Sequence, residues 1–168
     1  MRQLTELRYL VLAGQRATNR MLADMLKPLG LTPSQAEILR VLADHGPLSL
    51  AGLGALLVCE PGSPSRIVSS LARRGLVCRD SGTEDRRTIR LSLTAAGRTA
   101  HAGVVAVEHA MCQRLADIGT PDEVEQTSAL LRRLVAGTPQ GDALTARGES
   151  ECPPSERFAS TSDRREAV

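Results

Sequence analysis

The largest concentration of charge in this sequence is a group of arginines between residues 61 and 98. This stretch carries eight arginines and only three acidic residues, whereas the whole chain of 168 residues has a formal net charge of +2. A guanidinium group stays protonated and forms paired hydrogen bonds to phosphates and base edges, so a local surplus of arginine is typical of a surface that binds a polyanion. The sequence therefore indicates a localised polyanion contact.

Within this stretch, residues 63–73 place small hydroxyl side chains and two arginines on one face of an expected short helix. Small side chains allow the backbone to approach a groove closely, and Arg66 has the donor geometry for a guanine edge. An ordinary solvated surface is the competing interpretation of this face. The candidate contact residues are Ser63, Pro64, Ser65, Arg66, Ser69, Ser70 and Arg73, together with Ser49 at the start of the preceding helix.

A second candidate is the polar segment 80–88, which separates two expected strands. Arg86 and Arg87 on a projecting hairpin tip would reach phosphates or a minor groove, whose negative potential attracts arginine. Asp85 would hold Arg87 through a charge-assisted hydrogen bond, and Arg90 carries the same charge onto the second strand. A charged, solvated loop is the alternative interpretation.

Cysteine chemistry has weaker support. The four cysteines, at positions 59, 78, 112 and 152, form no CxxC pair and have spacings unlike a zinc ribbon or a disulfide framework. Cys59 and Cys78 lie where oxidation would disturb the basic region, so a thiol-based redox sensor stays open as an alternative.

Metal and enzyme chemistry are not supported by spacing. Glu108, His109 and Cys112 are ligand types at neighbouring helical positions, but a zinc site needs three or four ligands and such pairs are common by chance. No serine, histidine and acid set falls at a recognisable motif spacing. We expect no metal, no cofactor and no enzymatic activity.

The elements that position these residues follow from the periodicity of the apolar residues. After Gly75 the period changes from helical to alternating, which predicts an antiparallel hairpin. Two short helices joined by a tight turn and followed by a hairpin form a winged helix-turn-helix, whose second helix enters the DNA major groove. The expected helices span about 1–27, 33–44, 50–57, 64–74, 95–118 and 121–136, and the expected strands span 76–79 and 89–93.

Capping signals support these boundaries. Thr32 with Gln35 and Thr120 with Glu123 are capping boxes, each followed by proline at the first helical position. Serines and threonines at other helix starts are also expected to cap, including Ser49, Ser63 and Thr94. The predicted fold class is mainly α with a small two- to three-stranded antiparallel wing.

Five short segments have a distinctive order and spacing. They are Leu31-Thr32-Pro33-Ser34-Gln35, Ser65-Arg66-Ile67-Val68 through Leu71, Arg74-Gly75-Leu76-Val77, Asp85-Arg86-Arg87 and Leu91-Ser92-Leu93-Thr94-Ala95-Ala96-Gly97. In this order and spacing the segments resemble the MarR family of bacterial transcription regulators. The resemblance covers about residues 1–136. It implies a domain over 1–137, with a DNA-binding core over about 31–94 and a dimerisation region made of the helices at about 1–27, 95–118 and 121–136.

The same resemblance implies a function. A member of this family would be a homodimeric, sequence-specific regulator that binds a pseudo-palindromic operator in double-stranded DNA, with Arg87 at the position that enters the minor groove. It implies a ligand-responsive repressor, whose small-molecule effector binds between the dimerisation and DNA-binding parts. A winged helix that binds an acidic protein partner is the main alternative.

Composition narrows the partners and the location. The chain has no Trp, one Tyr and one Phe, which weighs against binding of single strands by base stacking. No run of 18 apolar residues exists to span a membrane, and no apolar leader stretch opens the chain, so we expect a cytoplasmic protein without a membrane partner.

Residues 138–168 are expected to form a disordered tail. Only Leu144, Phe158 and Val168 in this stretch are Leu, Ile, Val or Phe, and such a composition buries too little apolar surface to offset the entropy of ordering. Removal of residues 140–168 is therefore expected to leave folding and operator affinity within about 1 kcal/mol of the full chain.

Overall fold

A computed structural model of the chain describes residues 2–59, 63–81 and 89–148. Helices dominate these residues, and the strands form one antiparallel pair, which confirms the predicted fold class. The elements in chain order are α1 (Arg2–Leu26), a short 3-10 helix (Lys27–Leu29), α2 (Pro33–His45), α3 (Leu50–Ala55), α4 (Pro64–Arg73), β1 (Val77–Ser81), β2 (Ile89–Leu93), α5 (Ala95–Ala116), α6 (Pro121–Val135) and α7 (Pro139–Ala146).

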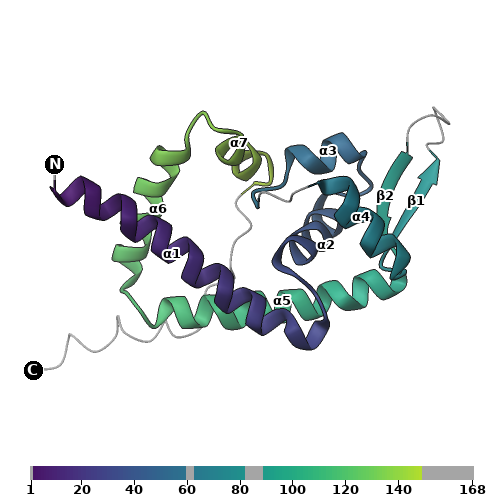
Figure 1. The fold of residues 1–168 in the computed structure, drawn as a ribbon, viewed down its shortest axis with the longest axis horizontal. Coiled ribbons are helices and arrows are strands. Elements are labelled where there is room, and N and C mark those ends of the chain that lie inside the picture. Colours follow the sequence, from purple (N-terminus) through teal and green to yellow (C-terminus); the bar gives the residue numbers. More distant parts are fainter. Residues whose placement is uncertain (1, 60–62, 82–88, 149–168) are drawn as a thin grey trace, which may run out of the picture.

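Two long helices, α1 and α5, form the frame of the molecule. They run along its long axis, with α2, α3, α4 and the sheet at one end and α6 towards the other (Figure 1). α5 contacts α1, α2 and β2. This helix therefore links the helix-turn-helix end of the molecule to the terminal helices.

A continuous apolar core holds the helix-turn-helix end together. Leu26 from α1 and Val104 from α5 join it, so the frame helices are anchored in the same core. Full burial of a leucine side chain contributes about 1.5–3 kcal/mol. The largest fully buried side chains are Leu26, Ile38, Leu39, Val41, Leu53, Val68, Leu71, Leu91 and Val104.

The wing is a two-stranded sheet extended by one bridge. β1 and β2 pair antiparallel, with Val77 opposite Leu93 and Ser81 opposite Ile89. Leu48, just before α3, forms an isolated bridge with Leu91 through two backbone hydrogen bonds of 3.1 and 2.7 Å. The bridge stands where a third strand of the predicted two- to three-stranded wing would pair. It also joins the sheet to the residue just before α3.

Side-chain caps set the start of most helices, as the sequence predicts. Such a cap satisfies a backbone N–H that has no partner within the helix. The capping boxes of α2 and α6 are complete, with both reciprocal hydrogen bonds present. The confirmed caps are Thr32 for α2, Ser49 for α3, Thr94 for α5 and Thr120 for α6.

The start of α4 differs from this pattern. Ser63 occupies the N-cap position, but its side chain makes no capping hydrogen bond, so the prediction that it caps the helix is wrong. Its backbone is extended, and Pro64 at the first helical position supplies a φ that already suits a helix. The Ser63 carbonyl still accepts from the backbone N–H of Arg66 at 3.0 Å.

The expectation of a disordered segment beginning at residue 138 is wrong for the residues that form α7. Thr138 caps this helix, Pro139 opens it, and Gly141 and Ala143 are buried. Gly141 packs so closely on the helix before it that a Cβ there would collide with the carbonyl oxygen of Val135. The prediction counted only Leu, Ile, Val and Phe, so it did not include the burial of small residues such as these. Residues 149–168 of the expected tail lie outside the described part of the chain.

Exposed apolar side chains gather on α1 and α6. Leu4 is 68% exposed, Leu10 61% and Leu134 62%. Apolar exposure on this scale along two helices marks an interaction surface. None of the described helices is long and apolar enough to cross a membrane.

Candidate nucleic-acid interface

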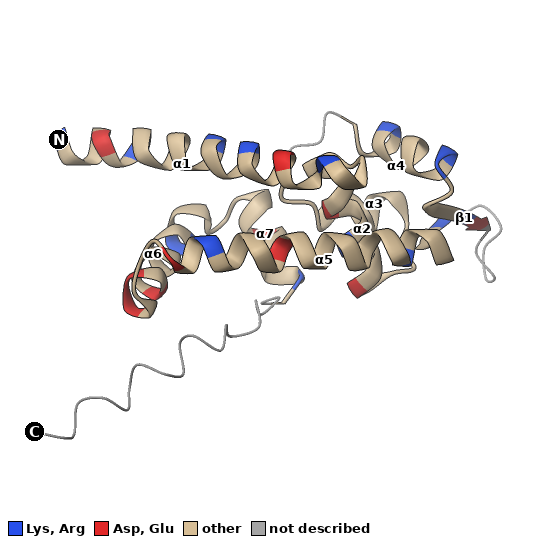
Figure 2. Ribbon diagram, turned by 90° about the horizontal axis from the view of Figure 1, so that it is seen from below, with Lys and Arg blue, Asp and Glu red and all other residues tan. Residues whose placement is uncertain are grey.

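Helix α4 has two chemically distinct sides. Val68 and Leu71 are fully buried against the core, whereas Ser65, Arg66 and Arg73 are exposed. Within the described residues, no hydrogen bond or ion pair occupies the guanidinium of Arg66 or of Arg73. Figure 2 shows the basic positions of α4 on the outer side of the helix, at the same end of the molecule as the wing. The core thus fixes the helix while its polar side stays available to a partner.

Two of the predicted serines on α4 are less exposed than the arginines. Ser69 Oγ donates to the carbonyl oxygen of Ser65 at 2.8 Å and accepts from Arg79 Nη2 at 2.7 Å. Ser70, like Ser69, is half-buried. Ser69 is therefore part of a link between α4 and the wing.

Arg79 was not among the candidate contact residues, although it belongs to this surface. It is exposed and lies on β1, two residues after the buried Val77. Because alternate residues of a strand share a face, Arg79 lies on the same face as Val77. The strand alternation in the sequence was the signal that could have placed it beside the α4 serines.

Three other arginines donate to backbone carbonyl groups within the domain. Arg74 Nη1 donates to Gly30 at 2.9 Å, and Arg98 Nη1 donates to Leu93 at 3.0 Å. Arg90 Nη1 donates to Pro47 at 3.3 Å while the residue remains exposed. Since a guanidinium has five N–H donors, this bond leaves Arg90 able to contact a partner as well.

The predicted wing contacts cannot be placed in the same way. Asp85, Arg86 and Arg87 fall within residues 82–88, which lie outside the described residues. The strands on either side of this segment, β1 and β2, pair beyond α4 at one end of the molecule (Figure 1). Ser49 caps α3 through a 3.0 Å hydrogen bond from the Gly52 N–H and is half-buried.

The two cysteines of the redox hypothesis occupy different environments. Burial and the nearby Glu37 carboxylate raise the pKa of Cys59 from 9.0 to about 11. A thiol with such a high pKa carries little thiolate near neutral pH, so Cys59 is a poor oxidant sensor. Cys78 on β1 lies 2.8 Å from the Ser92 hydroxyl and is half-buried.

Glu108, one of the three ligand types noted on α5, takes part in an ion pair with an arginine. Arg40 Nη1 donates to the Glu108 carboxylate at 3.2 Å and Arg40 Nε donates to Asp44 at 2.8 Å. Across the described ranges, no three His, Cys, Asp or Glu side chains are grouped as a metal site would need.

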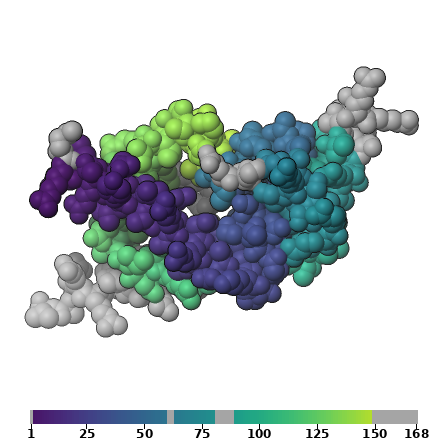
Figure 3. All heavy atoms as spheres, viewed as in Figure 1, coloured from purple at the N-terminus to yellow at the C-terminus, as the bar shows by residue number. Residues whose placement is uncertain are grey.

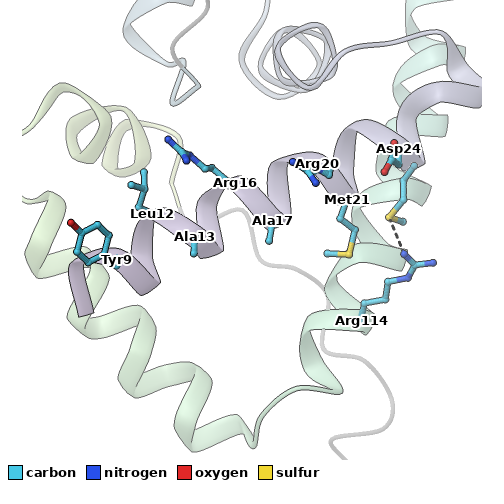
Figure 4. Close-up of a pocket in the computed structure, with 10 residues that line it drawn as sticks. Tyr9, Leu12, Ala13, Arg16, Ala17, Arg20, Met21, Asp24 and Arg114 are labelled. Carbon is cyan, nitrogen blue, oxygen red and sulfur yellow. Dashed lines mark hydrogen bonds between the residues drawn. The ribbon is translucent and has the colours of Figure 1, made fainter. Parts of the chain in front are cut away.

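An open groove of about 950 Å³ runs along α1 and is lined by α1 side chains and by Arg114 of α5 (Figure 4). Tyr9 and Met21 contribute apolar surface, and Arg16, Arg20 and Arg114 contribute positive charge. Arg114 reaches across from α5, with its Nη1 3.8 Å from the sulfur of Met25. The groove is therefore formed by the helices outside the helix-turn-helix.

Comparison with known proteins matches this geometry. A profile described as a winged helix DNA-binding domain matches residues 31–97, which include α2, α3, α4 and the wing. The chain is 30% identical over 120 residues to the HTH-type transcriptional repressor MdtR of Bacillus subtilis, and the match covers 71% of this chain and 77% of MdtR.

Solved structures of MarR from E. coli have the same architecture. The apo form is 25% identical, with a TM-score of 0.64, and the match covers 77% of this chain and 96% of MarR. A cysteine-to-serine mutant of MarR complexed with operator DNA is 24% identical, with a TM-score of 0.72 and coverage of 79% and 96%. The match to MdtR, the winged helix profile and the shared architecture together lead to one conclusion: this chain belongs to the MarR family of winged helix-turn-helix transcription regulators.

Proposed function

We propose that the chain acts as a homodimeric repressor that binds a pseudo-palindromic operator in double-stranded DNA and releases it in response to a small molecule. The observation that carries this proposal is the two-sided character of α4. Its apolar side is locked in the core by Val68 and Leu71, and its outer side presents Arg66 and Arg73 without partners among the described residues. A recognition helix needs this combination of rigid support and unoccupied donors.

The proposed contacts divide into two classes. Arg66, in the first turn of α4, is proposed to read a base edge in the major groove, with the small hydroxyl side chains around it allowing close approach. Arg86 and Arg87 are proposed to contact phosphates or the minor groove, with Asp85 holding Arg87. The remaining proposed contact residues are Ser49, Ser63, Pro64, Ser65, Ser69, Ser70, Arg73 and Arg90.

The proposed dimer uses the terminal helices. The exposed leucines of α1 and α6, among them Leu4, Leu10 and Leu134, supply a surface that a second copy of the chain would cover. A two-fold symmetric dimer presents two α4 helices to two half-sites, about 10 base pairs apart or a multiple of that spacing. Symmetry of the protein would then appear as symmetry of the operator.

Repression and effector response are proposed from the family and the groove. MdtR is a repressor, and MarR has been crystallised with operator DNA. The groove beside α1 combines apolar and basic side chains with the carboxylate of Asp24. It is lined by the proposed dimerisation helices α1 and α5, and not by the boundary with the DNA-binding core at which the resemblance implies an effector. The proposed activity is binding and release of DNA in the cytoplasm, without catalysis.

Two alternatives from the sequence remain distinct proposals. A winged helix that binds an acidic protein would use the same basic side of α4. A thiol-based regulator of the same fold would use Cys78 rather than Cys59, because Cys59 is kept protonated by its surroundings. The first alternative predicts no sequence-specific binding to DNA. The second predicts DNA binding that changes when Cys78 is oxidised.

The decisive experiment is selection of bound fragments from genomic DNA by the purified full chain. The proposal predicts enrichment of a two-fold symmetric site. In a salt titration on that site, the logarithm of the binding constant should fall linearly with the logarithm of the salt concentration, by about 0.9 for each phosphate neutralised. An Arg66→Ala and Arg73→Ala double variant, checked for folding by circular dichroism, is the matched control and should lose the enrichment. A folded parent chain that enriches no sequence would refute the proposal.

A further inference from the structure

The C-terminal helix α7 is fixed to the helix that precedes it. Thr138 Oγ1 donates to the Val135 carbonyl oxygen at 2.7 Å and accepts from the Gly141 N–H at 3.2 Å. Gly137 between the helices has a φ of 74°, in the left-handed region that favours glycine, and allows the chain to reverse. The position of α7 is therefore set by its junction with α6.

From the end of α7, the side chain of Arg147 reaches the helix-turn-helix. Its Nε donates to the Leu56 carbonyl oxygen at 2.6 Å, and its Nη2 donates to the carboxylate of Glu37 on α2. Only 18% of the Arg147 side chain and 10% of the Glu37 side chain are exposed. In Figure 3 the yellow end of α7 lies beside the blue surface around α3.

The Glu37 carboxylate also holds the segment that leads towards α4. It accepts from the Val58 N–H at 2.7 Å and from the Cys59 N–H at 3.1 Å. Cys59 is only four residues before Ser63, the N-cap of α4. One carboxylate thus joins α2, the chain after α3 and the C-terminal extension.

We propose that Arg147 is a positioning residue for DNA binding, which sets the recognition helix through Glu37 without touching DNA. This inference rests on the proposed function. The guanidinium balances the largely buried Glu37 charge and fixes the Leu56 carbonyl, so the carboxylate stays aimed at the backbone of Val58 and Cys59. Operator affinity would then depend on a residue in the C-terminal extension, far along the chain from α4.

The test compares full-length variants on the operator selected by the parent chain and on a scrambled duplex. Arg147→Ala is expected to weaken operator binding at least about fivefold, the lower range for coupling between sites. Its salt slope should not change, because the number of neutralised phosphates stays the same. Arg147→Lys should regain part of the affinity, and binding to the scrambled duplex should stay as in the parent. Asp142→Asn changes one exposed charge on α7 without altering the Arg147–Glu37 pair, so it is the matched control and is expected to lie within twofold of the parent.

The outcomes separate this inference from the proposed function. If the parent binds its operator and Arg147→Ala binds it within twofold, the inference is wrong and the proposed function stands. If Arg147→Ala loses affinity equally on the operator and on the scrambled duplex, with a smaller salt slope, Arg147 contacts phosphate. That result would also overturn the inference. If Arg147→Ala does not fold, Glu37→Gln tests the same link from the other side, since it removes the charge but keeps one acceptor for the backbone. Glu37→Gln with parental affinity would then overturn the inference.

Discussion

Replacement of Leu134 on α6 tests whether the exposed apolar side chains form a dimer interface. Leu134 is 62% exposed in the single chain, so its truncation to alanine removes little from the fold of one protomer. In a two-fold symmetric dimer the same change occurs twice. The variant should therefore weaken association much more than it weakens folding.

The magnitude follows from the exposed fraction. Leu134→Ala removes three carbons, and at about 0.8 kcal/mol per carbon their complete burial is worth about 2.4 kcal/mol. Since 62% of the residue is left to be covered by a partner, each copy loses about 1.5 kcal/mol. Two copies lose about 3 kcal/mol, which raises the dimer Kd by roughly 150-fold.

Sedimentation equilibrium over a dilution series measures this Kd directly. Leu50→Ala is the matched control, because Leu50 on α3 is 41% exposed but lies outside the proposed interface. It should leave the dimer Kd within about threefold of the parent. A parent chain that is monomeric at micromolar concentration, or a Leu134→Ala variant that dimerises as tightly as Leu50→Ala, would refute the interface.

Four further predictions concern the proposed DNA contacts and Cys59. Arg66→Ala should cost about 1–3 kcal/mol on the selected operator and relax the choice at one base position in each half-site, as a repeated selection would show. Arg87→Ala should weaken binding evenly across sequences and flatten the salt slope by about 0.9 for each phosphate that is no longer neutralised, so an unchanged slope in a salt titration would contradict the wing assignment. Because the pKa of Cys59 is raised to about 11, its alkylation rate in the folded chain should keep rising with pH up to that value, whereas a plateau near its ordinary value of 9.0 would argue against the burial. The same shift predicts that stability is fully present below pH 9.0 and falls as the pH rises towards 11, which thermal melting can follow.

Local signals account for what the sequence predicted well. The boxes at Thr32 and Thr120 fix helix starts through hydrogen bonds between residues three apart, so they depend little on the rest of the fold. The alternation of Ile89, Leu91 and Leu93 likewise predicted β2 with its observed bounds. Ser63 shows the limit of such signals, because a capping residue type in the right position need not form the hydrogen bond.

The contact residues were predictable as a region but not as a set of contacts. A count of arginines cannot distinguish Arg66, which is unpartnered among the described residues, from Arg74, which is bound to the carbonyl of Gly30. That difference depends on the packing of α4 against α2 and the loop before it. The contact of Arg79 with Ser69 likewise joins a strand to a helix and becomes visible only in three dimensions.

The C-terminal extension was misjudged because only its large apolar side chains were counted. α7 buries Gly141 and Ala143, which add almost nothing to such a count, and it is held at one end by the Thr138 cap. Its other end is held by Arg147 and Glu37, which are 110 residues apart in the chain. Charged residues usually indicate a solvated segment. Arg147 differs because it pairs with Glu37, whose carboxylate already accepts hydrogen bonds from two backbone N–H groups in the folded chain. Composition can exclude a large core, but it cannot exclude a short helix that is held by a cap, a close glycine contact and an ion pair.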